Sequence, residues 1–159
     1  MRPKAFGERP PRLERVFPTK TRPVYFVTFC THERKPWLAR SNVHDSFVQF
    51  ASRAAEHFNI AVGRYVIMPD HMHLFVCGGP DFVLANWIGA LKQALAKGAA
   101  KRRSQGQIWQ EGFFDHMLRS DESMSQKWEY IRENPVRAGF ATCTGDWLYQ
   151  GEIVPIDRA

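Results

Sequence analysis

Alternation of side-chain character in residues 69–76 constrains the fold of this chain more than any other feature. Successive side chains of an extended strand point to opposite faces of a sheet. His71 and His73 would therefore leave one face together, and the apolar residues that alternate with them would leave the other. The segment predicts a strand that buries one face and presents two imidazoles on the other. Such a pair can hold one divalent metal ion, or it can be an incidental pair on a sheet surface.

Residues 123–139 carry a helical pattern further along the chain. Three apolar side chains recur at i, i+4 and i+7, which places them in one stripe of a helix. They are Met124, Trp128 and Ile131. Ser120 or Asp121 can cap the start of this helix. Pro135 is expected to end it, because proline lacks an amide N–H and disfavours helix at the residue before it.

Tyr130 would project from this helix roughly 120° from the centre of the apolar stripe, at about 100° per residue. Its neighbours in projection are polar or basic: Lys127, Asn134 and Arg137. A helical tyrosine usually packs in the core, but these neighbours favour an exposed phenol. Asn134 follows Tyr130 by one turn, which would place its amide above the phenol. Asn134 can equally serve only to turn the chain into the proline.

Taken together, these segments resemble the REP-associated tyrosine transposases. They are a branch of the HUH class of single-strand DNA nucleases, in which U is a bulky apolar residue, here Met72. The similarity spans residues 24–139 and lies in three stretches in the expected order: 68–74, 108–119 and 130–139. Either outer motif alone is weak, whereas the pair in this order is specific.

The resemblance implies that His71 and His73 bind a divalent metal, that Asn134 completes the site, and that Tyr130 attacks a DNA phosphate. The product would be a 5′-phosphotyrosine with a free 3′-hydroxyl. Magnesium prefers oxygen ligands, whereas imidazole favours manganese or zinc. The expected cofactor is a divalent metal, Mg²⁺ with Mn²⁺ able to replace it. The expected partner is single-stranded or hairpin DNA, bound by a monomer rather than a homodimer. Two alternatives stay open: a non-catalytic DNA-binding regulator on the same fold, and a metal-dependent phosphodiesterase that uses water as nucleophile.

Length and composition bound the organisation of the chain. Its 159 residues are 44% hydrophobic, which suits one globular domain, expected over 23–159. No apolar run is long enough to cross a membrane, and no signal-peptide pattern is present. The three cysteines, Cys30, Cys77 and Cys143, lack CxxC spacing and indicate reduced thiols in a cytoplasmic protein.

Residues 1–22 form an expected basic arm. They contain seven basic and two acidic side chains, so five of the six net positive charges of the chain lie there. Arms of this kind reach along phosphate backbones, although a solubilising tail would look the same. The candidate DNA contacts in the arm are Arg12, Arg15, Lys20 and Arg22.

Further DNA contacts are expected in the folded domain. A cluster at Lys97, Lys101, Arg102 and Arg103 follows a predicted helix, and it can bind phosphates or simply complement the helix dipole. The other candidates are His116, Arg119, Lys127 and Arg137. Trp109, Phe113 and Phe114 are candidates for base stacking, although core packing is expected for at least two of them.

The order of elements predicts the fold. Strands are expected at 24–30, 60–68, 71–76 and 113–118, the middle two joined tightly at Pro69-Asp70. One helix would run from a cap at Ser41 or Asn42 to Phe58, and a second would open at Asp81. The chain is thus predicted to be α+β, with a ferredoxin-like β-α-β-β-α-β antiparallel sheet and helices on one face. An added C-terminal helix carries Tyr130.

Overall fold

The computed structural model describes residues 22–118 and 121–156. The basic arm therefore lies outside the described residues, except for Arg22. The elements in chain order are β1 (Val24–Cys30), η1 (His32–Arg34), α3 (Ser41–His57), β2 (Ala61–Ile67), β3 (His71–Cys77), α4 (Leu84–Gly98), η2 (Arg103–Gln105), β4 (Phe114–Leu118), α5 (Asp121–Ile131), α6 (Asn134–Arg137), η3 (Thr144–Asp146) and β5 (Gln150–Glu152).

The strands form one five-stranded sheet in the order β4-β1-β3-β2-β5, and every neighbouring pair is antiparallel. The first four strands have the order expected of a ferredoxin-like sheet, so the predicted fold is confirmed. β5 was not predicted. It has three residues, which is too short to show a recognisable alternation, and it pairs with the outer edge of β2.

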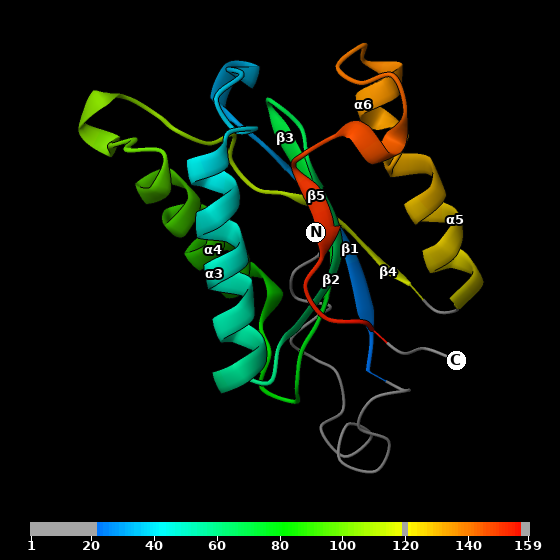
Figure 1. The fold of residues 1–159 in the computed structure, drawn as a ribbon. Coiled ribbons are helices and arrows are strands. Elements are labelled where there is room, and N and C mark those ends of the chain that lie inside the picture. The colour runs from blue at the N-terminus through cyan, green and yellow to red at the C-terminus, as the bar shows by residue number, and fades with distance from the viewer. Residues whose placement is uncertain (1–21, 119–120, 157–159) are drawn as a thin grey trace.

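Helices cover both faces of the sheet (Figure 1). α3 and α4 lie on one face, called the helix face below, over a cluster of twenty buried residues that includes Phe29, Phe47 and Leu74. α5 and α6 lie on the other face, over a cluster of seven buried residues that includes Phe75 and Ile131. The second face carries His71 and His73, because they share the parity of Phe75 along β3. It is called the histidine face.

The two helices on the helix face begin differently from the prediction. α4 starts at Leu84 rather than Asp81, because the chain first makes a turn in which the Phe82 amide donates to the Gly79 carbonyl at 3.1 Å. α3 starts at Ser41 with no side-chain cap on its first turn. The Asn42 side chain instead accepts from the adjacent Val43 amide at 2.8 Å.

The prediction that Pro135 ends the helix of Tyr130 is wrong. α5 already ends at Ile131, and Pro135 lies in the first turn of the separate helix α6. The first turn of a helix tolerates proline, because its amide would have no partner inside the helix. Tyr130 and Asn134 therefore belong to different helices, and their predicted stacking within one helix is wrong. Of the two predicted caps, Asp121 is the first residue of α5 and Ser120 lies outside the described residues.

Within residues 22–118 and 121–156, no helix has both the length and the apolar character needed to span a bilayer.

Candidate active site

His71 and His73 lie side by side on β3, as the alternation predicts. Their ring centroids are 4.9 Å apart and the rings are nearly perpendicular, at 80°. The residues between and after them, Met72 and Leu74, are fully buried in the helix-face cluster. Burial of those two side chains fixes the strand register, so the two imidazoles are presented together.

One nitrogen of each imidazole is held by a neighbouring side chain. His73 Nδ1 shares a hydrogen bond with the Thr28 hydroxyl at 2.7 Å, across the β1–β3 pair in which these two residues are partners. His71 Nδ1 lies 2.7 Å from the Asp70 carboxylate and donates to it. Bonds of this kind fix the ring orientation of metal-binding histidines and leave Nε2 as the free nitrogen.

Asp70 is itself held in place. Arg34 Nε donates to its second carboxylate oxygen at 3.0 Å, and the Thr31 amide donates to its backbone carbonyl at 3.0 Å. Partial burial alone would raise the pKa of Asp70, but the hydrogen bonds from His71 and Arg34 outweigh it and lower the pKa. Glu33 and Arg34 both adopt left-handed backbone, with φ of 54°. Such strain in non-glycine residues is typical of segments that position functional groups.

His73 is held in its neutral form. Burial, together with smaller contributions from the charges of His71 and Arg137, lowers the pKa of His73 from 6.5 to about 3. A neutral imidazole is the form that coordinates a metal ion. The influence of Arg137 also shows that α6 brings its charge close to β3.

Tyr130 is exposed, as the helical projection predicts: 67% of its surface is accessible, whereas the next residue, Ile131, is 2% exposed. The Arg137 guanidinium lies over the phenol ring, 4.2 Å from its centroid. Arg137 also donates to the Tyr130 backbone carbonyl at 2.8 Å and to the Asn134 side-chain oxygen. Arg137 therefore contacts both Tyr130 and Asn134, and its charge also acts on His73.

Aromatic and basic side chains surround the histidines on the same face. The Phe26 ring stacks on His73 at 5.5 Å, and Lys127 Nζ lies 5.3 Å from the centre of that phenyl ring. Phe114 pairs with Thr28 and is 69% exposed, while the exposed His116 pairs with Phe26. Lys127, Arg137 and His116 are thus the predicted DNA contacts that share a face with the histidines.

The remaining predicted contacts lie elsewhere. Lys101, Arg102 and Arg103 follow α4, on the helix-face side. Arg22 precedes β1 and donates to Asn59 at 3.2 Å, at the end of the sheet away from His71, which pairs with the last residue of β1. Arg12, Arg15, Lys20 and Arg119 lie outside the described residues. Trp109 and Phe113 pack against the helix-face cluster, as expected for at least two of the three proposed stacking residues.

Sequence reasoning missed Thr28, Asp70 and Arg34. Asp70 had an available signal, because it directly precedes His71 and a carboxylate beside a candidate metal-binding histidine commonly orients the ring. Thr28 and Arg34 had none, since their contacts depend on the pairing of β1 with β3 and on the path of the η1 segment.

The family model described as "Transposase IS200 like" matches residues 19–134, a stretch that contains the histidine pair, Tyr130 and Asn134. The chain belongs to the IS200-like transposases. A Haemophilus influenzae protein named as a REP-associated tyrosine transposase is 29% identical over 156 residues, covering 84% of this chain and 86% of that protein. The REP-associated tyrosine transposase of Escherichia coli K12 is 28% identical over 90 residues, covering 55% of this chain and 52% of that protein.

A solved structure supports the fold assignment. It is a REP-associated tyrosine transposase bound to a REP hairpin, with a TM-score of 0.66 and 20% identity, covering 80% of this chain and 75% of the other. At that identity the likeness establishes the shared fold of this IS200-like transposase.

The resemblance to HUH nucleases implies a metal ion, and the donor atoms fit one. Two imidazoles with their Nδ1 atoms already bonded can offer Nε2 to the same divalent cation. Among the described residues, no three His, Cys, Asp or Glu side chains lie together as a possible metal site, and the predicted third ligand is of another type, an amide oxygen. The Asn134 amide oxygen is of that type. In this structure it accepts a hydrogen bond from Arg137, which would compete with a metal for the oxygen.

Proposed function

We propose that this IS200-like transposase is a metal-dependent single-strand DNA endonuclease and strand transferase, with Tyr130 as the nucleophile and REP-type hairpin DNA as the substrate. The observation that carries the proposal is the arrangement around Arg137. This residue covers the exposed Tyr130 ring and lies close enough to His73 to lower its pKa. The hairpin substrate is supported by family membership and by the hairpin bound to the structural relative.

The proposed reaction exchanges one phosphoester for another. The Tyr130 phenol oxygen attacks the phosphorus, the bond from phosphorus to the 3′-oxygen breaks, and the protein carries a 5′-phosphotyrosine. The phenol loses its proton to solvent, which reaches the exposed ring, and the departing 3′-oxygen takes up a proton to become a hydroxyl. The phosphoester bond is retained, so a 3′-hydroxyl of the same or another strand can reverse the attack and join DNA.

The side chains around the phenol support this chemistry. Phenols are weak nucleophiles at neutral pH unless their anion is stabilised. The positive charge of Arg137 lies at the ring face, and Lys127 lies on the same side of the sheet over Phe26. Both cations can also bind the phosphate oxygens, on which negative charge is concentrated in the transition state.

His71, His73 and Asn134 would hold the divalent cation, Mg²⁺ or Mn²⁺, which when bound draws charge from the phosphate oxygens. Thr28 and Asp70 would hold the imidazoles ready for it, and burial of His73 keeps that imidazole unprotonated. A monomer as the active form and a cytoplasmic location, where the exposed Cys143 would stay reduced, belong to the same proposal.

The test is to trap the covalent intermediate. Full-length protein is incubated with Mn²⁺ and a labelled hairpin oligonucleotide that carries single-stranded flanks, and the products are separated under denaturing conditions. We expect labelled DNA to migrate with the protein, and Tyr130→Phe to abolish both the adduct and the nick while DNA binding persists. Tyr149→Phe, which removes the hydroxyl of a tyrosine whose ring contacts the rings of Trp147 and His44, is the matched control and should react normally.

The two alternatives give different results in this experiment. A regulator without catalysis binds the hairpin and neither nicks it nor forms an adduct. A phosphodiesterase that uses water nicks the hairpin without any adduct, and Tyr130→Phe leaves its rate unchanged.

A further inference from the structure

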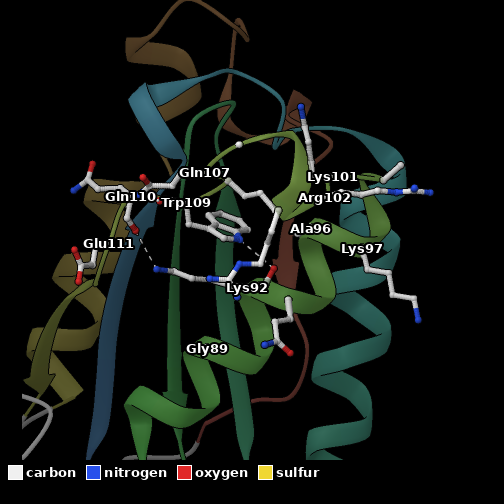
Figure 2. A pocket seen from close by; sticks show the side chains of 15 residues that line it. Gly89, Lys92, Ala96, Lys97, Lys101, Arg102, Gln107, Trp109, Gln110 and Glu111 are labelled. Atoms are coloured by element: carbon white, nitrogen blue, oxygen red, sulfur yellow. Dashed lines mark hydrogen bonds between the residues drawn. The ribbon is translucent and has the colours of Figure 1, made fainter.

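A broad basic groove lies on the α4 side of the molecule (Figure 2), and neither His71 nor His73 is among its lining residues. It has a volume of about 1000 Å³ and lies between α4 and the segment that leads to β4. Its charged and amide-bearing lining residues are Lys92, Gln93, Lys97, Lys101, Arg102, Arg103, Gln107, Gln110 and Glu111. Lysine and arginine outnumber acidic residues by five to one in this lining, so the groove suits an anionic partner.

Lys92 already has a structural role in the groove wall. Its Nζ donates to the carbonyls of Gln110 and Gly112, at 3.2 and 2.8 Å, and burial lowers its pKa. These bonds fasten the segment after α4 onto the helix. Lys92 is therefore part of the floor and is not counted as a ligand for a partner.

The other four cations lie at one end of the groove (Figure 2 labels three of them): Lys97, Lys101, Arg102 and Arg103. Among the described residues, none of the four forms an ion pair with an acidic side chain. The helix dipole accounts for Lys97, which lies in the last turn of α4. It does not account for Arg102 and Arg103, because the helix ends at Gly98 and the dipole effect fades within one turn.

The groove and the histidine face differ in how far their aromatic side chains are exposed. The aromatic residue of the groove, Trp109, is packed edge-on against Phe29 and Trp37, and its indole N–H donates to the Lys92 carbonyl at 3.2 Å. Trp109 is half-buried, and Lys92 Nζ lies 5.9 Å from its ring centroid. On the histidine face, Phe114 and Tyr130 are 69% and 67% exposed. Unpaired bases bind by stacking on rings, whereas a duplex is held through its phosphates.

We propose that the basic groove binds the phosphate backbone of a DNA duplex, the paired stem of the hairpin, while the single-stranded segment lies across the histidine face. Arg102 and Arg103 are exposed and beyond the helix, so they are assigned as phosphate contacts, with Lys97 and Lys101 beside them. Exposed amides of Gln107 and Gln110 can donate to the same backbone. The hairpin enters this inference from the proposed function, whereas the duplex preference comes from the groove itself.

Salt-dependent binding of the full-length protein tests this assignment. The probes are a labelled, fully paired hairpin and a labelled oligo-dT of equal length. The variant is Arg102→Gln/Arg103→Gln, which spares Lys101 because that side chain packs over Trp37 at 5.3 Å. The control is Arg53→Gln, an exposed arginine on α3 outside the groove.

Each duplex phosphate contact contributes about 0.9 to the slope of log affinity against log salt. We expect the hairpin slope of the double variant to be smaller by about 1.8. The ratio of hairpin affinity between the unmodified protein and the double variant should therefore fall about tenfold over a fourfold rise in salt. The oligo-dT slope should not change, and Arg53→Gln should match the unmodified protein on both probes.

An unchanged hairpin slope overturns the assignment, and so does an equal loss on oligo-dT. The assignment is also overturned if Arg53→Gln lowers the hairpin slope by as much per arginine removed as the double variant does. General surface charge would then explain the binding. The covalent adduct of Tyr130 is read separately. Absence of the adduct with a groove-dependent hairpin slope refutes the proposed chemistry alone, and a normal adduct with an unchanged slope refutes the groove alone.

Discussion

The two faces of the sheet differ in how completely they are covered. On the helix face, α3 and α4 cover a cluster of twenty buried residues, and the side chains of β3 that point there are fully buried. On the histidine face the described cluster has seven buried residues, and Tyr130 and Phe114 stay exposed beside it. One face supplies most of the apolar burial, and the other keeps polar and aromatic groups accessible.

Because of this difference, one side of strand β3 contributes to the stability of the fold and the other side carries the candidate metal ligands. β3 places Met72 and Leu74 in the larger core and His71 and His73 on the opposite side. The core holds the strand rigidly, so the imidazoles need only short hydrogen bonds to Thr28 and Asp70 to fix their orientation. Because sites built on strands are more rigid than sites built on loops, two ligands on β3 are well placed for a metal that must be positioned accurately.

The largest effect is expected from removal of the histidines. His71→Ala or His73→Ala should reduce Mn²⁺-dependent cleavage by more than about 100-fold, the upper limit for loss of a group that only orients a ligand. Asn134→Ala should have a smaller effect, because an amide oxygen binds such metals more weakly than imidazole. The measurement is cleavage of labelled hairpin DNA over a Mn²⁺ titration, with a chelator added to the unmodified protein for comparison.

His44→Gln is the matched control on the helix face, where His44 shares a 2.7 Å hydrogen bond with Tyr65. It should cleave normally. Crystals soaked in Mn²⁺ provide an independent check, and an ion bound away from both imidazoles of β3 would refute the metal site.

A second effect concerns acid stability without metal. The pKa of His73 is about 3 in the folded protein and near 6.5 in the unfolded chain, so the unfolded chain binds the extra proton between these values. The free energy of unfolding should therefore fall as the pH drops from about 6.5 to about 3, by on the order of 3–5 kcal/mol from this group. His73→Asn, whose amide can still bond Thr28, should flatten this dependence in urea unfolding with chelator present.

The pKa of His44 is also lowered by burial, on the opposite face. His44→Gln should flatten the same pH profile less than His73→Asn does. A larger effect from His44 would mean that the helix face, and not the histidine face, controls acid stability.

The smallest effect is expected from the residues that orient His71. Asp70→Ala should weaken Mn²⁺ binding about 10–100-fold, as is usual for carboxylates that hold metal-binding histidines. Arg34→Ala should weaken it less, since Arg34 acts through Asp70. Calorimetric titration of Tyr130→Phe protein with Mn²⁺ measures both changes without turnover. Lys35→Ala is the control in the same segment, where the Lys35 ammonium lies 3.9 Å from the Glu33 carboxylate, and an equal effect from it would indicate general disruption of the segment.

Much of the fold could be predicted from local patterns. The alternation around His71 and His73, the apolar stripe of α5 and the order of four strands each depend on the geometry of a single element. The elements that were misjudged are those in which a competing local contact decides: the Gly79–Phe82 turn delayed α4, and Pro135 started a helix where it was expected to end one.

The sequence by itself determined which side chains each element presents: two histidines on one face of a strand and an exposed tyrosine beside an apolar stripe. Only the tertiary structure decided what meets them. Thr28 reaches His73 through the register of β1 on β3, Arg34 reaches Asp70 through the strained η1 segment, and Arg137 covers Tyr130 from a separate helix. Periodicity is a property of one segment, whereas these contacts depend on strand register and on packing between segments distant in the chain, which no local pattern encodes.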